Sequence, residues 1–168
     1  MNIPIKKLHP NAVMPKYAKQ GDSGFDLVAI ENVIIEPGET KLVKTGLAFE
    51  IPEGFEIQVR PRSGITLKTK LRVQLGTVDS NYRGEVGVIV DNAYYDPCDD
   101  GEIMYKAAGI DEEPTGDKYF PYGTYLIRKG DRIAQAILAP VAYTTFEEVD
   151  ELSETNRGSN GYGSTGIN

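Results

Sequence analysis

The chain has 168 residues, which suits one domain with a sizeable core. Its formal net charge is −7, so in bulk it repels nucleic acid and anionic membranes, and a polyanionic ligand needs local cations or a metal. A single cysteine, Cys98, allows no internal disulfide, and a single histidine, His9, excludes a zinc site built from Cys and His. No signal-like stretch or membrane-length apolar run is present. We therefore expect a cytoplasmic protein that binds neither nucleic acid nor membrane.

The pattern along the chain is mostly β. Residues 55–60 alternate strictly between apolar and polar, and residues 41–49 and 125–141 are rich in strand formers. Turn signals recur at 37–38, 52–54 and 129–130. The best helical candidate is a brief turn near 65–70. Short strands at short spacing predict an all-β barrel or sandwich.

A strand-to-turn transition near residue 60 offers groups that bind phosphate. Arg62, Ser63 and Gly64 follow a strand pattern and a proline. Arg62 supplies a guanidinium, Ser63 a hydroxyl donor, and the missing side chain of Gly64 lets backbone N–H groups approach phosphate oxygens. The same residues also suit an ordinary turn at a strand end, so both interpretations stay open.

The next segment, GTVDSNYRGE at 76–85, places a carboxylate and a tyrosine three residues apart, at Asp79 and Tyr82. Residues 71–75 alternate and residues 86–90 are apolar and β-branched, so the Asp-Ser-Asn connector is predicted to be a hairpin loop. An Asp and a Tyr on one rigid hairpin can act on one small ligand. A solvated turn is the alternative, because Asp, Ser and Asn are ordinary turn formers.

Residues 93–118 differ in composition from the rest of the chain. Eight acidic residues and two lysines give this segment a net charge of −6. Its aromatic content exceeds that of a disordered acidic tract, so we expect a protruding hairpin with an apolar side on the barrel and an acidic side exposed. Such an insertion would be dispensable for catalysis and available to a protein partner. A solvated acidic loop is the simpler alternative.

The chain ends in a glycine-rich segment, residues 157–168. Its glycines stand at 158, 161, 163 and 166. This glycine density does not suit a packed strand and is typical of a flexible arm that orders around a ligand. Tyr162, an isolated aromatic among the glycines, is suited to stacking on a base. A mobile tail without a ligand is the alternative.

Five blocks, in chain order, resemble the five sequence motifs of the trimeric deoxyuridine triphosphatases. They are DSGFDL at 22–27, PRSG at 61–64, GTVDSNYRGE at 76–85, GDRIAQ at 130–135 and RGSNGYGSTG at 157–166. The match spans nearly the whole chain. It implies a distorted jelly-roll β-barrel over residues 1–156, with the insertion protruding, and a substrate-closing arm over 157–168. It also implies a homotrimer whose sites are shared between subunits.

The resemblance implies the hydrolysis of dUTP to dUMP and pyrophosphate, which limits uracil incorporation into DNA. Asp79 matches the aspartate that activates a water for attack on the α-phosphorus, with Mg²⁺ for charge stabilisation. The Mg²⁺ would be held mainly by the substrate phosphates. Asp26 matches the first-motif aspartate, which is tied to metal-bound water.

The resemblance also implies the substrate contacts. Tyr82 would pack beneath the deoxyribose and exclude a 2′-hydroxyl, and backbone groups of Gly76, Thr77 and Val78 would read the uracil edge. The implied ligands of the phosphate chain are Arg62, Ser63, Gly64, Gln135, Arg157, Ser164 and Thr165, and Tyr162 and Gly163 complete the substrate site.

Three features depart from the family pattern. Tyr162 stands where phenylalanine is most common and keeps the stacking face. Residues 73–75 lack the small side chains often found before the third motif, which bears on base contacts. The insertion at 93–118 is absent from compact members and is similar to the longer, phage-encoded ones.

Two other functions fit parts of the pattern. A deoxycytidine triphosphate deaminase shares the fold, but it needs a catalytic glutamate in the central hairpin and lacks a C-terminal arm of this type. A regulatory protein that binds a partner through the acidic insertion, with the nucleotide as effector, is the second alternative. It is compatible with catalysis.

Overall fold

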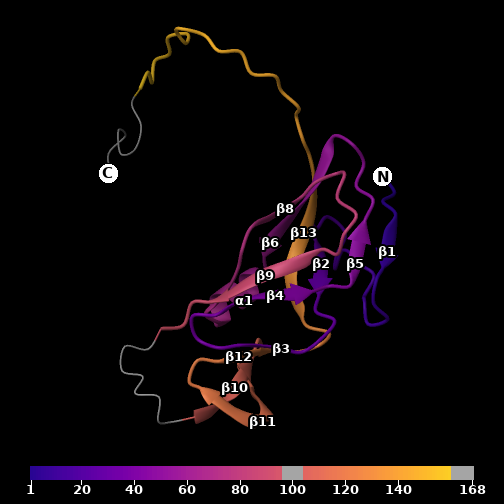
Figure 1. Cartoon of the computed structure of the whole chain (residues 1–168), viewed down its shortest axis with the longest axis vertical. Coiled ribbons are helices and arrows are strands. Elements are labelled where there is room, and N and C mark those ends of the chain that lie inside the picture. Colours follow the sequence, from indigo (N-terminus) through magenta and orange to yellow (C-terminus); the bar gives the residue numbers. More distant parts are fainter. Residues whose placement is uncertain (96–103, 160–168) are drawn as a thin grey trace.

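The computed structural model describes residues 1–95 and 104–159, which form short β-strands and one six-residue helix (Figure 1). The elements in chain order are β1 (Ile5–Lys7), β2 (Phe25–Val28), β3 (Val33–Ile35), β4 (Thr40–Lys44), β5 (Leu47–Phe49), β6 (Phe55–Pro61), α1 (Ser63–Lys68), β7 (Leu71–Val73), β8 (Gly76–Val78), β9 (Gly87–Asn92), β10 (Met104–Gly109), β11 (Pro114–Pro121), β12 (Tyr125–Ile127) and β13 (Arg132–Pro140). The predicted all-β class is confirmed. The helical turn expected near 65–70 is α1, which begins two residues earlier.

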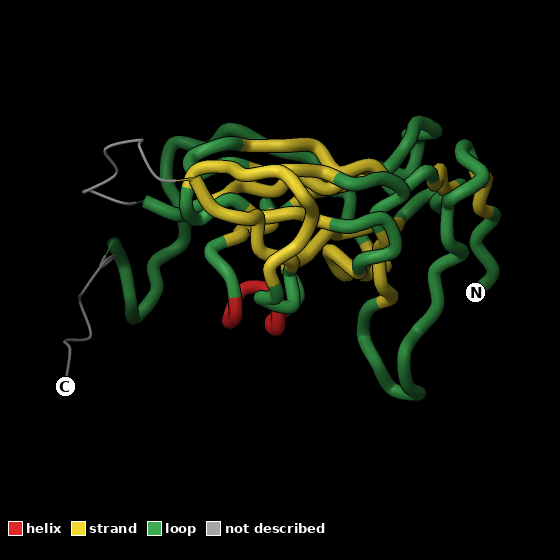
Figure 2. The backbone as a smooth tube through the Cα atoms, turned by 90° about the horizontal axis from the view of Figure 1, so that it is seen from below, coloured by secondary structure: helices red, strands yellow, loops and turns green. Residues whose placement is uncertain are grey.

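The strands of the described residues form four small sheets around one apolar core. Their orders are β1-β5, β11-β10-β12-β3, β2-β13-β6-β8 and β4-β9-β7. The core follows from alternation, since successive side chains of a strand point to opposite faces. In β6, for example, Ile57 and Val59 are buried, and in β9 Val88 and Val90 are buried. Figure 2 shows the strands as stacked layers with α1 projecting on one side.

β13 brings together three of the sequence blocks that resemble family motifs. It pairs antiparallel with β2 on one side and with β6 on the other. In this register Gln135 lies opposite Asp26 of β2 and Arg60 of β6. Because β6 leads directly into α1, the register also sets Arg62 beside the start of β13.

The predicted hairpin around residues 76–85 is more complex than a single turn. β7 pairs with β9, as the flanking patterns predicted. Between them, however, the chain crosses to another sheet, where β8 pairs with β6. The turn Asp79–Tyr82 therefore joins strands of two sheets. A pattern of apolar residues shows which residues form strands, but not which sheet a strand joins.

The insertion forms a hairpin of β10 and β11 beside the barrel (Figure 1). It joins the fold through parallel pairing of β10 with β12. Asn92 anchors its base: the buried Nδ2 donates to the backbone oxygens of Ile35 and Gly123 at 3.0 and 2.8 Å. Tyr122 packs edge-on against Tyr94 and Tyr105. The expected hairpin is confirmed for its described part, although β11 extends to residue 121.

After Pro140 the chain leaves the barrel and runs outward as an irregular extended segment (Figure 1). From residue 142 to 159 its side chains, including those of Tyr143 and Phe146, are exposed. Arg157 lies near the end of this described stretch, and residues 160–168 lie outside it. No helix among the described residues is long and apolar enough to cross a membrane.

Candidate active site

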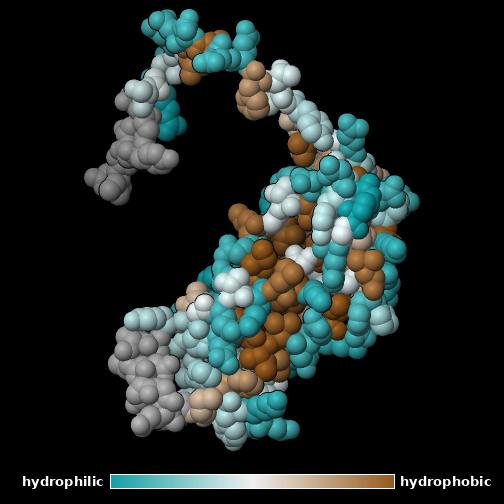
Figure 3. All heavy atoms as spheres, viewed as in Figure 1, coloured by the Kyte–Doolittle hydropathy of each residue, from teal (hydrophilic) through white to brown (hydrophobic). Residues whose placement is uncertain are grey.

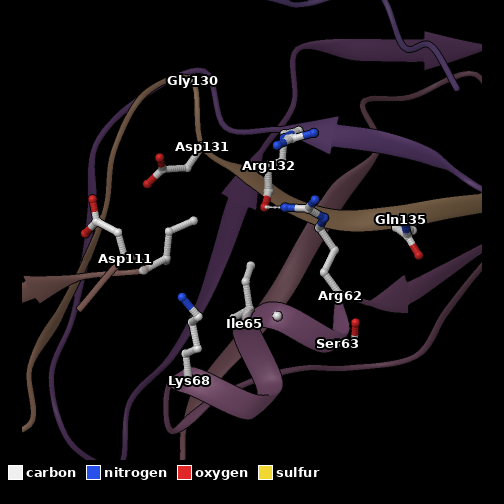
Figure 4. Close-up of a pocket in the computed structure, with 11 residues that line it drawn as sticks. Arg62, Ser63, Ile65, Lys68, Asp111, Gly130, Asp131, Arg132 and Gln135 are labelled. Carbon is white, nitrogen blue, oxygen red and sulfur yellow. Dashed lines mark hydrogen bonds between the residues drawn. The ribbon is translucent and has the colours of Figure 1, made fainter. Parts of the chain in front are cut away.

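A cavity of about 470 Å³ opens where β6 passes into α1 beside the start of β13 (Figure 4). Three segments far apart in sequence meet here. The lining residues are Arg62, Ser63, Gly64, Ile65, Lys68, Ile110, Asp111, Gly130, Asp131, Arg132 and Gln135. The four phosphate ligands predicted from the second and fourth blocks are thus together in one cavity. A Cβ built on Gly64 would meet no atom within 4 Å, so the space beside its backbone is open.

An ion-pair network fixes the arginines of this cavity. Oδ1 of Asp26 lies 3.1 Å from Nε of Arg62, and Oδ2 lies 3.2 Å from Nη1 of Arg132. Arg62 also donates from Nη1 to the backbone oxygen of Arg132 at 3.1 Å. The Asp26 side chain is only 13% exposed, whereas that of Arg132 is 55% exposed. Asp26 therefore holds two guanidinium groups at the edge of this cavity.

The carboxylate of Asp26, beside this cavity, is the candidate ligand for the water shell of a Mg²⁺ ion. Oδ1 of Asp26 is buried and close to Arg62, yet among the described residues no donor meets it with hydrogen-bond geometry. That orphaned oxygen retains capacity for a water molecule. The described part of the chain contains no cluster of three or more His, Cys, Asp or Glu side chains that could hold a metal. This donor set fits an ion carried mainly by phosphate oxygens, as Mg²⁺ commonly is.

The predicted catalytic hairpin lines a second cavity, of about 310 Å³. Its lining residues are Leu42, Thr77, Val78, Asp79, Tyr82, Glu85, Val86, Gly87 and Ile89. The turn is closed by a hydrogen bond from the backbone N–H of Tyr82 to the oxygen of Asp79 at 3.1 Å. The carboxylate of Asp79 is exposed, so it is accessible to a ligand.

Tyr82 has a defined position over this turn. Its hydroxyl donates to the backbone oxygen of Glu85 at 3.0 Å, and its ring lies against Gly84, where a Cβ would overlap the phenol. Glu85 is itself fixed, because Oε1 accepts a hydrogen bond from the backbone of Gly46 at 2.7 Å. Gly84 was missed by sequence reasoning as a site residue. Its position two residues after the tyrosine was the only available signal.

The two cavities share no lining residue. The predicted catalytic and base-reading residues line the smaller cavity: Thr77, Val78, Asp79 and Tyr82. The predicted phosphate ligands line the larger one: Arg62, Ser63, Gly64 and Gln135. Gly76 begins β8 beside the first group and packs against Val59 of β6. Arg157 lies on the extended C-terminal segment and lines neither cavity. Tyr162, Gly163, Ser164 and Thr165 fall outside the described residues.

Sequence reasoning also missed several lining residues of the first cavity. Arg132 and Asp131 stand inside the quoted block at 130–135, but only Gln135 was singled out. Lys68, at the end of α1, adds a cation. Ile110 and Asp111 come from the insertion, and their approach to this cavity depends on long-range strand pairing.

Comparison with known proteins gives the same family as the five sequence blocks. The dUTPase family model matches residues 10–97 and 123–166. The deoxyuridine 5′-triphosphate nucleotidohydrolases of Picosynechococcus sp. and Nautilia profundicola are 45% and 43% identical, and each alignment covers 99% of both chains.

Solved structures agree. The dUTPase of Staphylococcus bacteriophage 80alpha with dUPNHPP has a TM-score of 0.92, 34% identity and 99% coverage of both chains. The dUTPase from phage phi11 of S. aureus, in a structure that visualises its species-specific insert, has a TM-score of 0.85 and 30% identity, over 92% of this chain and 100% of the other. The chain belongs to the dUTPase family.

Proposed function

We propose that the chain hydrolyses dUTP to dUMP and pyrophosphate, and that the first cavity binds the triphosphate. The observation that carries this proposal is the convergence of Arg62, Ser63 and Gln135 on one cavity in a member of the dUTPase family. A guanidinium, a hydroxyl and an amide can each donate hydrogen bonds to phosphate oxygens. On a chain of net charge −7, such a local group is what a polyanion requires.

In this proposal Asp79 is the general base. Its carboxylate takes a proton from a water molecule, the water oxygen bonds to the α-phosphorus, and the bond from that phosphorus to the bridging oxygen breaks to release pyrophosphate. Arg62 and Ser63 bind and orient the phosphate chain, and Asp26 holds Arg62 in position. Mg²⁺ would supply charge stabilisation on the phosphate oxygens, and the orphaned oxygen of Asp26 would reach its water shell.

Selection of the nucleotide is assigned to the second cavity. Tyr82, whose ring lies against Gly84, would pack beneath the deoxyribose and leave no room for a 2′-hydroxyl. The backbone of Gly76, Thr77 and Val78 would read the uracil edge. The arm from residue 157 onward would close the site, with Arg157, Ser164 and Thr165 on phosphate oxygens and Tyr162 and Gly163 beside the base.

We further propose that the working enzyme is a homotrimer with composite sites. A catalytic hairpin and a phosphate cavity that share no lining residue in one subunit can complete each other across a subunit boundary. Apolar side chains gather over β4 and β9 on the face seen in Figure 3. There Leu42 and Ile89, opposite each other in the strand register, are 59% and 48% exposed. A second copy that covers this face would bring its own groups to Asp79.

The test is pyrophosphate release from dUTP, dCTP, dTTP and UTP, with and without Mg²⁺. We expect strong preference for dUTP, dependence on the metal and dUMP as the second product. Equal rates on all four nucleotides would contradict the proposal. Ammonia release from dCTP would instead indicate the deaminase.

Protein binding through the insertion is a second candidate function. Tyr119 in β11 and Tyr122 just after it are 60% and 53% exposed, and they follow directly on the acidic segment 93–118. Aromatic side chains are enriched in protein interfaces. This function is compatible with catalysis, and both would operate in the cytoplasm, where nucleotides are available. Retained dUTP hydrolysis with lost partner binding after Tyr119→Ala and Tyr122→Ala would support it.

A further inference from the structure

The insertion reaches the cavity that we assign to the triphosphate. Ile110 and Asp111, which follow β10, line the same cavity as Arg62 and Gln135 (Figure 4). The family model matches the chain up to residue 97 and again from residue 123, so these two residues belong to the unmatched part. One wall of the cavity is therefore built by a segment that the family pattern does not contain.

Arg128 ties this wall to the family fold. Its Nη1 lies 2.9 Å from Oδ2 of Asp111, and its Nε donates to Oγ1 of Thr115 at 3.3 Å. The backbone N–H of Arg128 donates to Oδ2 of Asp131 at 2.7 Å, which fixes the turn between β12 and β13. Gly109 leaves room for the pair, because a Cβ there would collide with both side chains.

The ion pair between Arg128 and Asp111 also affects the net charge at the cavity. The lining residues include three cations, Arg62, Lys68 and Arg132, against the carboxylates of Asp111 and Asp131. Among the described residues Lys68 forms no ion pair. The hydrogen bond from Arg128 lowers the pKa of Asp111, so this carboxylate is charged at neutral pH. Without Arg128, a bare negative charge would face an anion-binding cavity.

We propose that the insertion is part of the substrate site. Its Ile110–Asp111 turn closes one end of the phosphate cavity, and Arg128 neutralises Asp111 at that turn, so that the triphosphate meets no unpaired carboxylate. Arg128 is thus a positioning residue, and it acts through Asp111. This inference rests on the proposed function, because it takes the cavity as the site of the phosphate chain.

The test compares steady-state dUTP hydrolysis by the wild type, Arg128→Gln, Asp111→Asn and the double variant at low ionic strength. Arg128→Gln should raise KM by about three- to tenfold with little change in kcat, because a bare charge weakens binding of substrate and transition state alike. Asp111→Asn should lower KM, and the double variant should return it to within about twofold of the wild type. The differences should shrink in about 0.5 M salt, where charges are screened.

Lys118→Gln is the matched control. It removes one positive charge from an exposed residue of the same hairpin that lines neither of the two cavities, so its KM should stay within about twofold of the wild type. An equal rise in KM for Lys118→Gln would overturn the inference in favour of bulk charge. A rise in KM in both single variants, without recovery in the double variant, would also overturn the inference. It would mean that the Arg128–Asp111 pair only supports the local structure. Thermal unfolding of each variant confirms that it is folded.

A failure of the proposed function, dUTP hydrolysis with the triphosphate in this cavity, would give other results. In that case the wild type would not hydrolyse dUTP, or Arg62→Gln would leave KM unchanged. A third outcome is an active wild type in which Arg62→Gln raises KM but Arg128→Gln does not. That result would support the assignment of the cavity to the triphosphate and would refute the role of the insertion.

Discussion

The phenol ring of Tyr82 lies against Gly84, and a methyl group at residue 84 would overlap the ring carbons and the hydroxyl. The hydroxyl is held by its hydrogen bond to the backbone oxygen of Glu85. The tyrosine is exposed, so the barrel core does not place it. Its position is determined within the turn itself, by a glycine two residues further along the chain.

Gly84→Ala should therefore act on sugar discrimination. The added Cβ displaces the Tyr82 ring, which opens space beneath the ribose and reduces the preference for dUTP over UTP. A steric pocket contact of this kind is worth about one to three kcal/mol, or roughly 5- to 150-fold in the ratio of kcat/KM values. Tyr82→Ala should give a similar ratio. Tyr82→Phe, which keeps the ring, serves as the control, and an unchanged ratio in Gly84→Ala would place the discrimination elsewhere.

Asp79→Asn tests the catalytic base. The amide keeps the size of the carboxylate but cannot accept the proton, so kcat should fall by about 10² or more while dUTP still binds. Single-turnover kinetics measure the rate of the chemical step, and calorimetric titration with a non-hydrolysable dUTP analogue measures the binding affinity. Because Asp79 is exposed, the variant should unfold at the wild-type temperature. Turnover at the wild-type rate would eliminate Asp79 as the base.

The sequence predicted much of this arrangement because its signals are local. Alternation predicted β6, and the apolar run at 86–90 predicted β9. Register is not a local property, however, and the approach of Asp26 to Arg62 and Arg132 depends on β13 pairing between β2 and β6. The position of Asp111 likewise depends on the parallel pairing of β10 with β12. The sequence predicted which residue types handle phosphate, but not which of them share a cavity.

Asp26→Asn separates two roles for that residue. If Asp26 mainly holds Arg62, its loss should lower kcat/KM for dUTP by about tenfold or more, since small displacements of a positioning group are costly. The lost contact with metal-bound water should also raise the Mg²⁺ concentration that gives half the maximal rate. Steady-state kinetics at varied dUTP and metal titrations at saturating dUTP measure the two effects. A raised Mg²⁺ requirement with kcat/KM for dUTP unaffected would leave only the metal role, and the reverse outcome would leave only the hold on Arg62.

Leu42→Asp tests the assembly. Leu42 is exposed in the single subunit, so the substitution should leave the fold intact, but it would bury a charge if another copy covers β4 and β9. We expect a trimer for the wild type and a monomer with little activity for the variant, measured by light scattering coupled to gel filtration. Tyr119→Asp adds the same charge at an exposed aromatic on the insertion and should stay trimeric. If Leu42→Asp remains trimeric, the face over β4 and β9 is not part of the subunit interface.

Truncation before Arg157 tests the arm. Among the described residues the barrel core contains none beyond β13, and residues 142–159 are exposed, so the shortened protein should fold with an unchanged unfolding temperature. Most dUTP hydrolysis should be lost, because the arm is proposed to clamp the phosphate chain and cover the base. Arg157→Gln in the full-length chain separates these effects: it should raise KM but leave base stacking by Tyr162 in place. Full activity of the truncated protein would refute a role for the arm, and a lowered unfolding temperature would show that the arm stabilises the fold.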